Sequence, residues 1–279
     1  MHFKTLLFLS AINSGLCASS PPAGSITVGP GGHYSTLSDA LTNTSSDVYF
    51  IYETSINERV VITRPNITIY GQTSDDESSY SKNLATIHNN IPASTAGSGE
   101  ASATVSIHAS ATDVKFYNLN IANTYGYVCH CGSQAIALSI NGTRFGAYGL
   151  NLTGYQDTLL TMNGIHFFSK GYINGAVDFA SWYLGHAEYD RDRRERVDYR
   201  FPASGRLFDD PFYYVIDQSN VIGTGIQYLG RPWRNYARVI FQNSVLGSQM
   251  QVQPAGWSEW SSTNPMTDHI FYGEFNNTG

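Results

Sequence analysis

Short runs in which apolar and polar residues alternate dominate the chain, whereas helical periodicity is scarce. Alternation with a period of two is typical of β-strands that bury one face. The one stretch with a helical pattern runs from Tyr34 to Leu41. Three alternating runs end in the same way, with an apolar residue, one further residue and then Asn or Gly. They cover residues 114–123, 145–154 and 166–175. The pattern predicts β structure built from repeated strands.

These runs recur at intervals that suit stacked coils. Leu152 follows Ile121 by 31 residues and Ile173 follows Leu152 by 21, so a common coil length requires one inserted loop in the first interval. A repeat of this length cannot bury a face alone, whereas stacked coils bury a continuous core. The sequence therefore predicts an all-β, right-handed parallel β-helix, with further strands at 67–69 and 237–241. A β-sandwich is the alternative, although hairpin dipeptides such as Asn-Gly do not punctuate the chain regularly.

The composition fits a single β-rich domain. The 279 residues include 26 glycines and 19 tyrosines but only 14% charged residues, and no linker divides them. Residues 1–18 resemble a signal peptide, with Lys4 ahead of an apolar run and small residues near the expected cleavage site. No other run approaches the ~20 apolar residues of a membrane span. We expect a secreted, extracellular β-helix domain at 19–279.

Five Asn-x-Ser/Thr sequons agree with secretion and predict a glycoprotein. They begin at Asn43, Asn66, Asn141, Asn151 and Asn276.

Charge and cysteine content narrow the classes of partner. The net charge of −6 does not favour nucleic acid or an anionic membrane, and it suits an uncharged or partly esterified polymer. Cys17 would leave with the signal peptide, so only Cys129 and Cys131 remain, too few for a disulfide framework. Two loop thiols or a strained local bridge explain this pair better than metal binding, because no His/Cys cluster completes a zinc set. We expect a monomer with no metal or organic cofactor.

Two aspartates occupy the same place in successive repeats. Asp157 lies five residues after Leu152, and Asp178 lies five residues after Ile173. Equivalent positions of neighbouring coils stack about 4.8 Å apart, so both carboxyl groups would share one outer face. Two carboxylates that close do not both ionise readily, so one pKa rises and the pair divides the roles of acid and base. The alternative is a pair of turn aspartates that align by chance in Gly-rich coils.

Four motifs surround this pair of aspartates. They are Gln134-Ala-Ile-Ala-Leu138, Gly154-Tyr-Gln-Asp157-Thr-Leu159, Gly175-Ala-Val-Asp178-Phe179 and Leu229-Gly-Arg231-Pro-Trp233. They resemble motifs of pectin methylesterases, and they occur in the family's order and at its approximate spacing. The resemblance covers most of the chain from about residue 26 to the end. It implies a parallel β-helix and a carboxylic ester hydrolase that removes methyl esters from pectin and releases methanol.

The resemblance also implies a role for each matching residue. Asp178 would be the nucleophile that attacks the ester carbonyl, and Asp157 would protonate the departing methoxide and then activate water. Gln134 and Gln156 would donate hydrogen bonds to the oxyanion. Arg231 would pair with Asp178 and keep it ionised. The residues that would bind the sugar rings are Trp233, Trp257 and Tyr155.

Several of these assignments have a structural alternative. Gln134 could be a buried amide in a stack, Arg231 a surface turn residue, and Trp233 part of the core. An ordinary esterase is a poorer match, because the chain has no G-x-S-x-G motif and its eight histidines are scattered.

The resemblance is interrupted beside the proposed nucleophile. After Phe179 the family usually continues with an apolar residue, Phe and Gly, but this chain reads Ala-Ser-Trp-Tyr-Leu-Gly and then a dense run of charged residues from Glu188 onward. We treat 180–202 as an atypical segment. Such a run favours a solvated loop; the alternatives are a charged loop that contacts substrate and a mispredicted exon. A second departure, an apparent insertion at 127–131, could shift Gln134.

Two other functions remain open from the sequence. A catalytically impaired, pectin-binding relative is favoured if the atypical segment displaces Asp178, because a misplacement of about 1 Å can cost a hundredfold in rate. A pectin-depolymerising β-helix enzyme is less favoured, because the Asn-Thr-Asp and late Arg-x-Lys segments of polygalacturonases are not seen.

Overall fold

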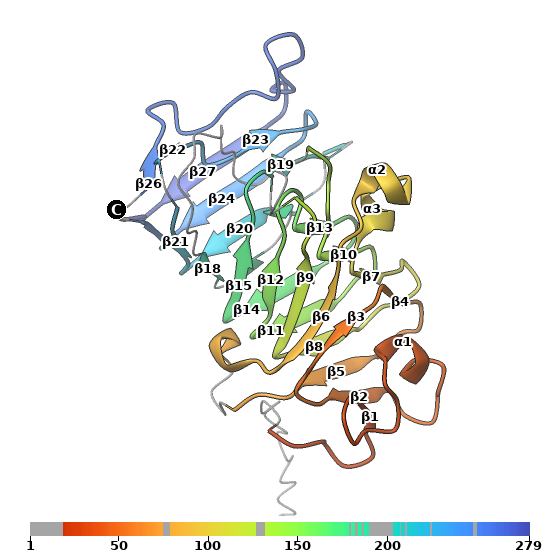
Figure 1. The fold of residues 1–279 in the computed structure, drawn as a ribbon. Coiled ribbons are helices and arrows are strands. Elements are labelled where there is room, and N and C mark those ends of the chain that lie inside the picture. Colours follow the sequence, from red (N-terminus) through yellow and green to blue (C-terminus); the bar gives the residue numbers. More distant parts are fainter. Residues whose placement is uncertain are drawn as a thin grey trace, which may run out of the picture.

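The computed structural model describes residues 19–74, 79–126, 132–178, 180–181, 184–185, 187–189, 203–206, 208–209, 211–223, 225–247 and 250–279. The predicted signal peptide, Cys129, Cys131, the apparent insertion at 127–131 and most of the atypical segment lie outside these ranges. The described chain winds in coils from β1 (Ile26–Val28) at one end to β27 (Phe271–Phe275) at the other (Figure 1).

Three parallel sheets of stacked strands form the sides of the coil in the described residues. The first contains, in spatial order, β1, β2 (Val48–Ile51), β5 (Thr68–Gly71), β8 (Lys115–Tyr117), β11 (Phe145–Tyr148) and β14 (His166–Ser169). The second contains β4 (Val60–Ile62), β7 (Val105–Ile107), β10 (Leu138–Ile140), β13 (Leu159–Thr161) and β16 (Ala180–Ser181). The third contains β3 (Thr54–Asn57), β6 (Ala85–Asn89), β9 (Leu119–Asn123), β12 (Asn151–Thr153), β15 (Gly171–Asn174), β18 (Ala187–Tyr189), β21 (Asn220–Val221) and β25 (Val245–Leu246).

Smaller parallel sheets complete the C-terminal coils. One contains β17 (Leu184–Gly185), β20 (Tyr214–Asp217), β24 (Arg238–Gln242) and β27. Two pairs are β19 (Ala203–Ser204) with β23 (Arg231–Pro232), and β22 (Gly225–Gln227) with β26 (Met250–Val252). All pairings between the named strands are parallel, so the β-helix prediction is confirmed and the sandwich, whose strands would pair antiparallel, is excluded.

The register of the third sheet matches the intervals in the sequence. Ile121 pairs with Leu152, and Leu152 pairs with Ile173, so the 31- and 21-residue intervals are successive coils. Ile87 precedes them in the same row, and all four side chains are buried. Stacking apolar residues at one register position removes a continuous strip of surface from water, which is the main stabilising term for a solenoid.

The chain bends between the first and third sheets through single residues in the left-handed conformation. Asn118, Gly149 and Lys170 occupy this place in successive coils with φ of 53°, 63° and 53°. Asn118 is also buried, and its amide donates to the Oδ1 of Asn83 at 3.0 Å. These three coils therefore turn at equivalent residues, which keeps their strands in register.

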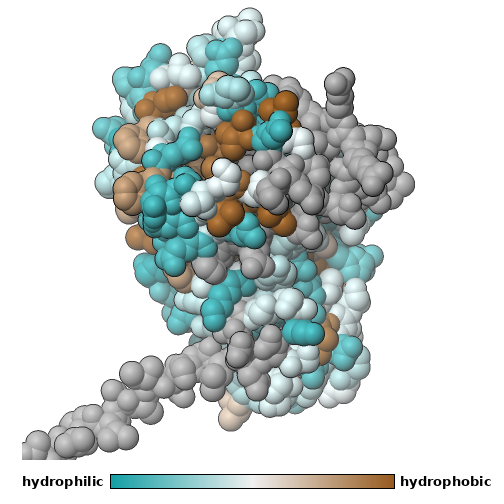
Figure 2. All heavy atoms as spheres, turned by 90° about the vertical axis from the view of Figure 1, so that its left-hand side faces the viewer, coloured by the Kyte–Doolittle hydropathy of each residue, from teal (hydrophilic) through white to brown (hydrophobic). Residues whose placement is uncertain are grey.

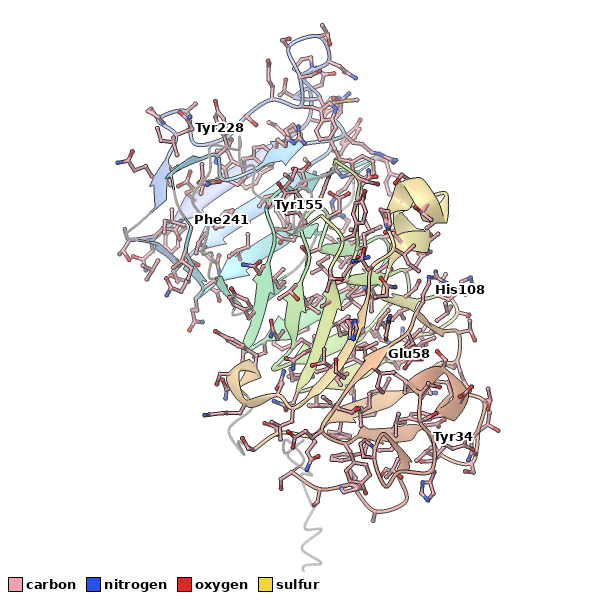
Figure 3. All side chains as sticks on the ribbon, viewed as in Figure 1. Tyr34, Glu58, His108, Tyr155, Tyr228 and Phe241 are labelled. Atoms are coloured by element: carbon pink, nitrogen blue, oxygen red, sulfur yellow. The ribbon has the colours of Figure 1, made fainter. Side chains whose placement is uncertain are left out.

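Helices are short in the described residues. They are α1 (Leu37–Ala40), α2 (Ala93–Ala96), α3 (Gly99–Ser102) and the 3₁₀ turn η1 (Tyr80–Lys82), and none is long and apolar enough to cross a bilayer. The helix predicted from Tyr34 to Leu41 is therefore confirmed only in its second half, Leu37–Ala40. Tyr34 pairs with Val28 instead. The α1 amide of Leu37 binds the Glu58 carboxylate, which lies next to the helix (Figure 3).

The C-terminal coils carry exposed apolar side chains. Ile226, Val245, Phe271 and Phe275 are each about half exposed or more. Figure 2, which views the molecule from the left of Figure 1, shows apolar patches in the upper half of that face. In the described sheet β27 is an edge strand, paired on one side with β24.

Candidate active site

Asp157 and Asp178 stack on adjacent coils, as their spacing predicts. Gln156 forms a parallel bridge with Val177, and Leu159 pairs with Ala180, so the two aspartates are register partners. The backbone amide of Asp157 donates to the Val177 carbonyl at 3.0 Å.

Both aspartates are also turn residues. Their φ angles are 60° for Asp157 and 43° for Asp178, the left-handed region that Asp adopts more readily than most residues. The alternative from the sequence, aligned turn aspartates, therefore describes the backbone correctly. It does not account for the side chains, because the two carboxyl groups interact with each other and with Arg231.

Arg231 holds Asp178 through a two-pronged ion pair. Its Nε donates to Oδ1 at 3.1 Å and its Nη2 donates to Oδ2 at 2.5 Å. Both side chains are largely buried, with 9% of Asp178 and 14% of Arg231 exposed. A bidentate guanidinium in such surroundings stabilises the ionised carboxylate. The surface-turn alternative for Arg231 is therefore wrong.

Asp157 has a different electrostatic environment. Its pKa rises from 3.8 to about 7, first because burial disfavours the charged form and second because the Asp178 carboxylate is close. Arg231 opposes this shift but does not cancel it. Near neutral pH Asp157 can therefore give up or accept a proton, whereas Asp178 is held in an ion pair with Arg231.

The two glutamines lie on adjacent coils beside the aspartates. The Gln156 carbonyl accepts from the Ala135 amide at 2.9 Å, which places Gln134 one residue before the partner of Gln156. Gln134 is exposed and Gln156 is half-buried, so Gln134 is not the buried amide of the alternative. Neither side-chain amide has a hydrogen-bond partner among the described residues, and both remain able to donate.

Of the predicted aromatic residues, Tyr155 and Trp233 lie next to this network. Tyr155 precedes Gln156 and lies where the central coils meet the C-terminal ones (Figure 3). Its ring packs over Gly126, where an added Cβ would lie 2.9 Å from the Tyr155 Cβ. Trp233 lies two residues after Arg231, just beyond the end of β23, and its backbone amide donates to the Ser204 carbonyl at 2.9 Å. Trp233 is partly exposed, so it is not a core residue.

Trp257 has a packing role in the described structure. Its ring stacks on Tyr272 with 4.2 Å between centroids and meets Phe241 edge-on, and its Nε1 donates to the Oε1 of Glu274 at 3.3 Å. Through these contacts the Trp257 ring packs against side chains of the C-terminal coils.

The structure adds one aromatic residue that the sequence reading did not assign. The guanidinium carbon of Arg231 lies 4.0 Å from the centroid of the Trp260 ring. Trp260 lies three residues after Trp257, the only residue of this segment to which the sequence analysis gave a role. An aromatic ring over a guanidinium stabilises the cation and limits its motion.

Comparison with known proteins gives a consistent result. A family model described as Pectinesterase matches residues 26–187 and 215–279. The pectinesterase of Aspergillus aculeatus is 38% identical over 293 aligned residues, covering 95% of this chain and 85% of the relative. The crystal structure of the pectin methylesterase of Aspergillus niger has a TM-score of 0.79 at 33% identity, covering 94% of this chain and 88% of that one. The carrot pectin methylesterase has a TM-score of 0.76 at 25% identity, covering 93% of this chain and 84% of that one. Residues 188–214, which include the whole charged run that begins at Glu188, lie outside the two matched ranges.

Proposed function

This chain belongs to the pectinesterase family, and from that membership we propose that it hydrolyses the methyl esters of pectin and releases methanol. The observation that carries the proposal is the stacked pair of aspartates in two different electrostatic environments. Asp178 is paired with Arg231, while the pKa of Asp157 is raised to about 7.

In the first half of the reaction, Asp178 acts as the nucleophile. One carboxylate oxygen forms a bond to the ester carbonyl carbon, and the carbonyl electrons move onto its oxygen. The bond to the methoxy group then breaks, and the departing oxygen takes the proton of Asp157. Methanol leaves, and the substrate acyl group remains attached to Asp178.

In the second half, Asp157 acts as the base. Its carboxylate takes a proton from water, and the resulting hydroxide attacks the acyl carbon. The bond to Asp178 breaks, which releases galacturonic acid and restores both aspartates to their starting states. The new carboxylic acid then loses its proton to solvent and becomes a carboxylate.

The free amides of Gln134 and Gln156 are suited to donate to the oxyanion that forms in both halves. Trp233 and Tyr155 offer aromatic surface to the sugar rings. For Trp257 the same role remains part of the proposal, although its ring already packs on Tyr272 and Phe241.

Methanol release from highly esterified pectin tests this function. We expect D178N to lower kcat by about a thousandfold or more. A matched control is D113N, because Asp113 is also a turn aspartate with φ of 61° but pairs with Arg144 on the surface. Undiminished release by folded D178N, or equal loss by D113N, would contradict the mechanism. The viscosity of the pectin should stay constant, whereas a depolymerising enzyme would lower it.

One observation favours the second candidate, a pectin-binding relative with impaired catalysis. The family model does not match 188–214, a range that begins in β18, the third-sheet strand beside β15. If the coil next to Asp178 holds it poorly, the protein should bind pectin without releasing methanol.

We also propose that residues 1–18 are a signal peptide and that the mature domain, 19–279, is a secreted monomer that needs no metal or organic cofactor. The sequence pattern of the N-terminus supports the first part.

A further inference from the structure

Arg234 stacks on one of the aromatic residues beside the aspartate pair. Its guanidinium carbon lies 4.0 Å from the centroid of the Trp233 ring. Trp233 itself rests on the backbone of Gly205, where an added Cβ would lie 2.4 Å from the indole Nε1. The close approach to Gly205 limits where the ring can lie, and the ring holds the guanidinium of Arg234 three residues along the chain from Arg231, the partner of Asp178.

Arg234 differs from the other stacked arginine of the site. Arg231 stacks on Trp260, and its Nε and Nη2 donate to the Asp178 carboxylate. Among the residues that the structure describes, Arg234 contacts no carboxylate. By contrast, Arg64, Arg144, Arg231 and Arg238 each form an ion pair with an aspartate of the described structure. Arg234 therefore keeps a positioned, partly exposed fork of N–H donors for a ligand.

The chemistry of that ligand follows from the donor set and the proposed reaction. A guanidinium fork binds a carboxylate through two parallel hydrogen bonds, and it has no comparable partner in a neutral methyl ester. Each turnover converts one ester of the polymer into a carboxylate. The net charge of −6 disfavours such an acidic product unless a local cation offsets it.

We propose that Arg234, held on Trp233, binds the carboxylate of an already de-esterified galacturonate that neighbours the ester being hydrolysed. This inference rests on the proposed function. It makes partly de-esterified pectin a better ligand than fully esterified pectin, and it favours successive hydrolysis along one chain.

Binding of two matched oligomers tests the inference without requiring turnover. The dissociation constants of a fully de-esterified hexagalacturonate and of its fully methylated form are measured by calorimetry for wild type, R234Q and R234K. The matched control is R59Q, since Arg59 is an exposed arginine in the N-terminal coils with no acidic partner in the described structure. We expect R234Q to bind the de-esterified oligomer about three- to tenfold more weakly, so that the preference for it over the methylated form narrows. R234K should lie between R234Q and wild type, and R59Q should match wild type.

Two patterns of dissociation constants would contradict the inference. Equal affinities for wild type and R234Q would overturn the inference, and so would equal losses for both oligomers, which would indicate that Arg234 only supports Trp233. R234K, which keeps the charge, provides the comparison if R234Q fails to fold. Methanol release by wild type is measured in parallel. Its absence would contradict the proposed function, whereas its presence with an unchanged preference in R234Q would contradict this inference alone.

Discussion

Asp157 and Asp178 share a residue type and a left-handed backbone, and their different surroundings assign them different chemistry. The sequence predicted a raised pKa from the repulsion of two close carboxylates. In the structure burial is the larger cause and the neighbouring charge comes second. The sequence could not supply that order, because burial depends on coils that lie far away along the chain.

The pKa of Asp157 leads to a prediction for the pH dependence of activity. The first step needs Asp157 protonated, and with a pKa of about 7 the protonated fraction falls as the pH rises through that value. We expect kcat/KM for methanol release to fall above about pH 7 and to approach a tenfold loss per pH unit. Initial rates at low substrate from about pH 5 to 9 measure it. A flat profile across neutrality would show that Asp157 does not act as the acid.

The stack of Trp260 on Arg231 leads to a second prediction at this scale. We expect W260A to lower kcat by about three- to thirtyfold, because Arg231 would lose a contact worth about 0.5–2 kcal/mol that orients it toward Asp178. W260F should recover part of the loss. W257A is the contrasting variant, and it should lower thermal stability more than W260A because Trp257 packs on Tyr272 and Phe241. If W260A changes only stability or only KM, Trp260 does not position Arg231.

At the scale of the element, the regular stacking of neighbouring coils brings Asp157 and Asp178 together. The intervals ending at Leu152 and Ile173 predicted the register correctly, because period and stacking are local properties that a solenoid repeats. The contacts of Trp233, Trp257 and Trp260 were not predictable in the same way. They depend on how the segments between the C-terminal strands pack, because all three tryptophans lie outside the strands and those segments have no repeat to read. Trp257 was therefore expected to be freely available to substrate, whereas two aromatic neighbours engage it.

The buried row of the third sheet gives a prediction about stability. Leu152 is fully buried between Ile121 and Ile173. We expect L152A to lower the free energy of unfolding by about 2–5 kcal/mol, the usual cost of lost burial plus a cavity. T153A is the matched control, since Thr153 is the next residue of the same strand but is only partly buried. Urea unfolding measures both, and similar midpoints for the two variants would mean that the row does not carry the core.

At the scale of the whole molecule, the surface restricts where glycans can attach. Asn66 is exposed at a turn before β5 with φ of 62°, and its side chain has no partner in the described structure. Asn151 lies inside β12, and its Oδ1 is buried. We expect protein secreted from a eukaryotic host to carry a glycan at Asn66 and none at Asn151. Mass spectrometry after enzymatic deglycosylation tests this, with N66Q as the control. Glycosylated Asn151 in active protein would contradict it.

Arg231 and Asp178 are 53 residues apart, and the ion pair between them joins a central coil to the C-terminal ones. In a solenoid each coil contacts only its neighbours, so heating can detach the terminal coils while the middle stays folded. We expect methanol release to decay at a lower temperature than the bulk β signal in circular dichroism, and coincident curves would contradict this. The rate of methanol release would then report the folding of the C-terminal coils, because only their packing against the central coils brings Arg231 to Asp178.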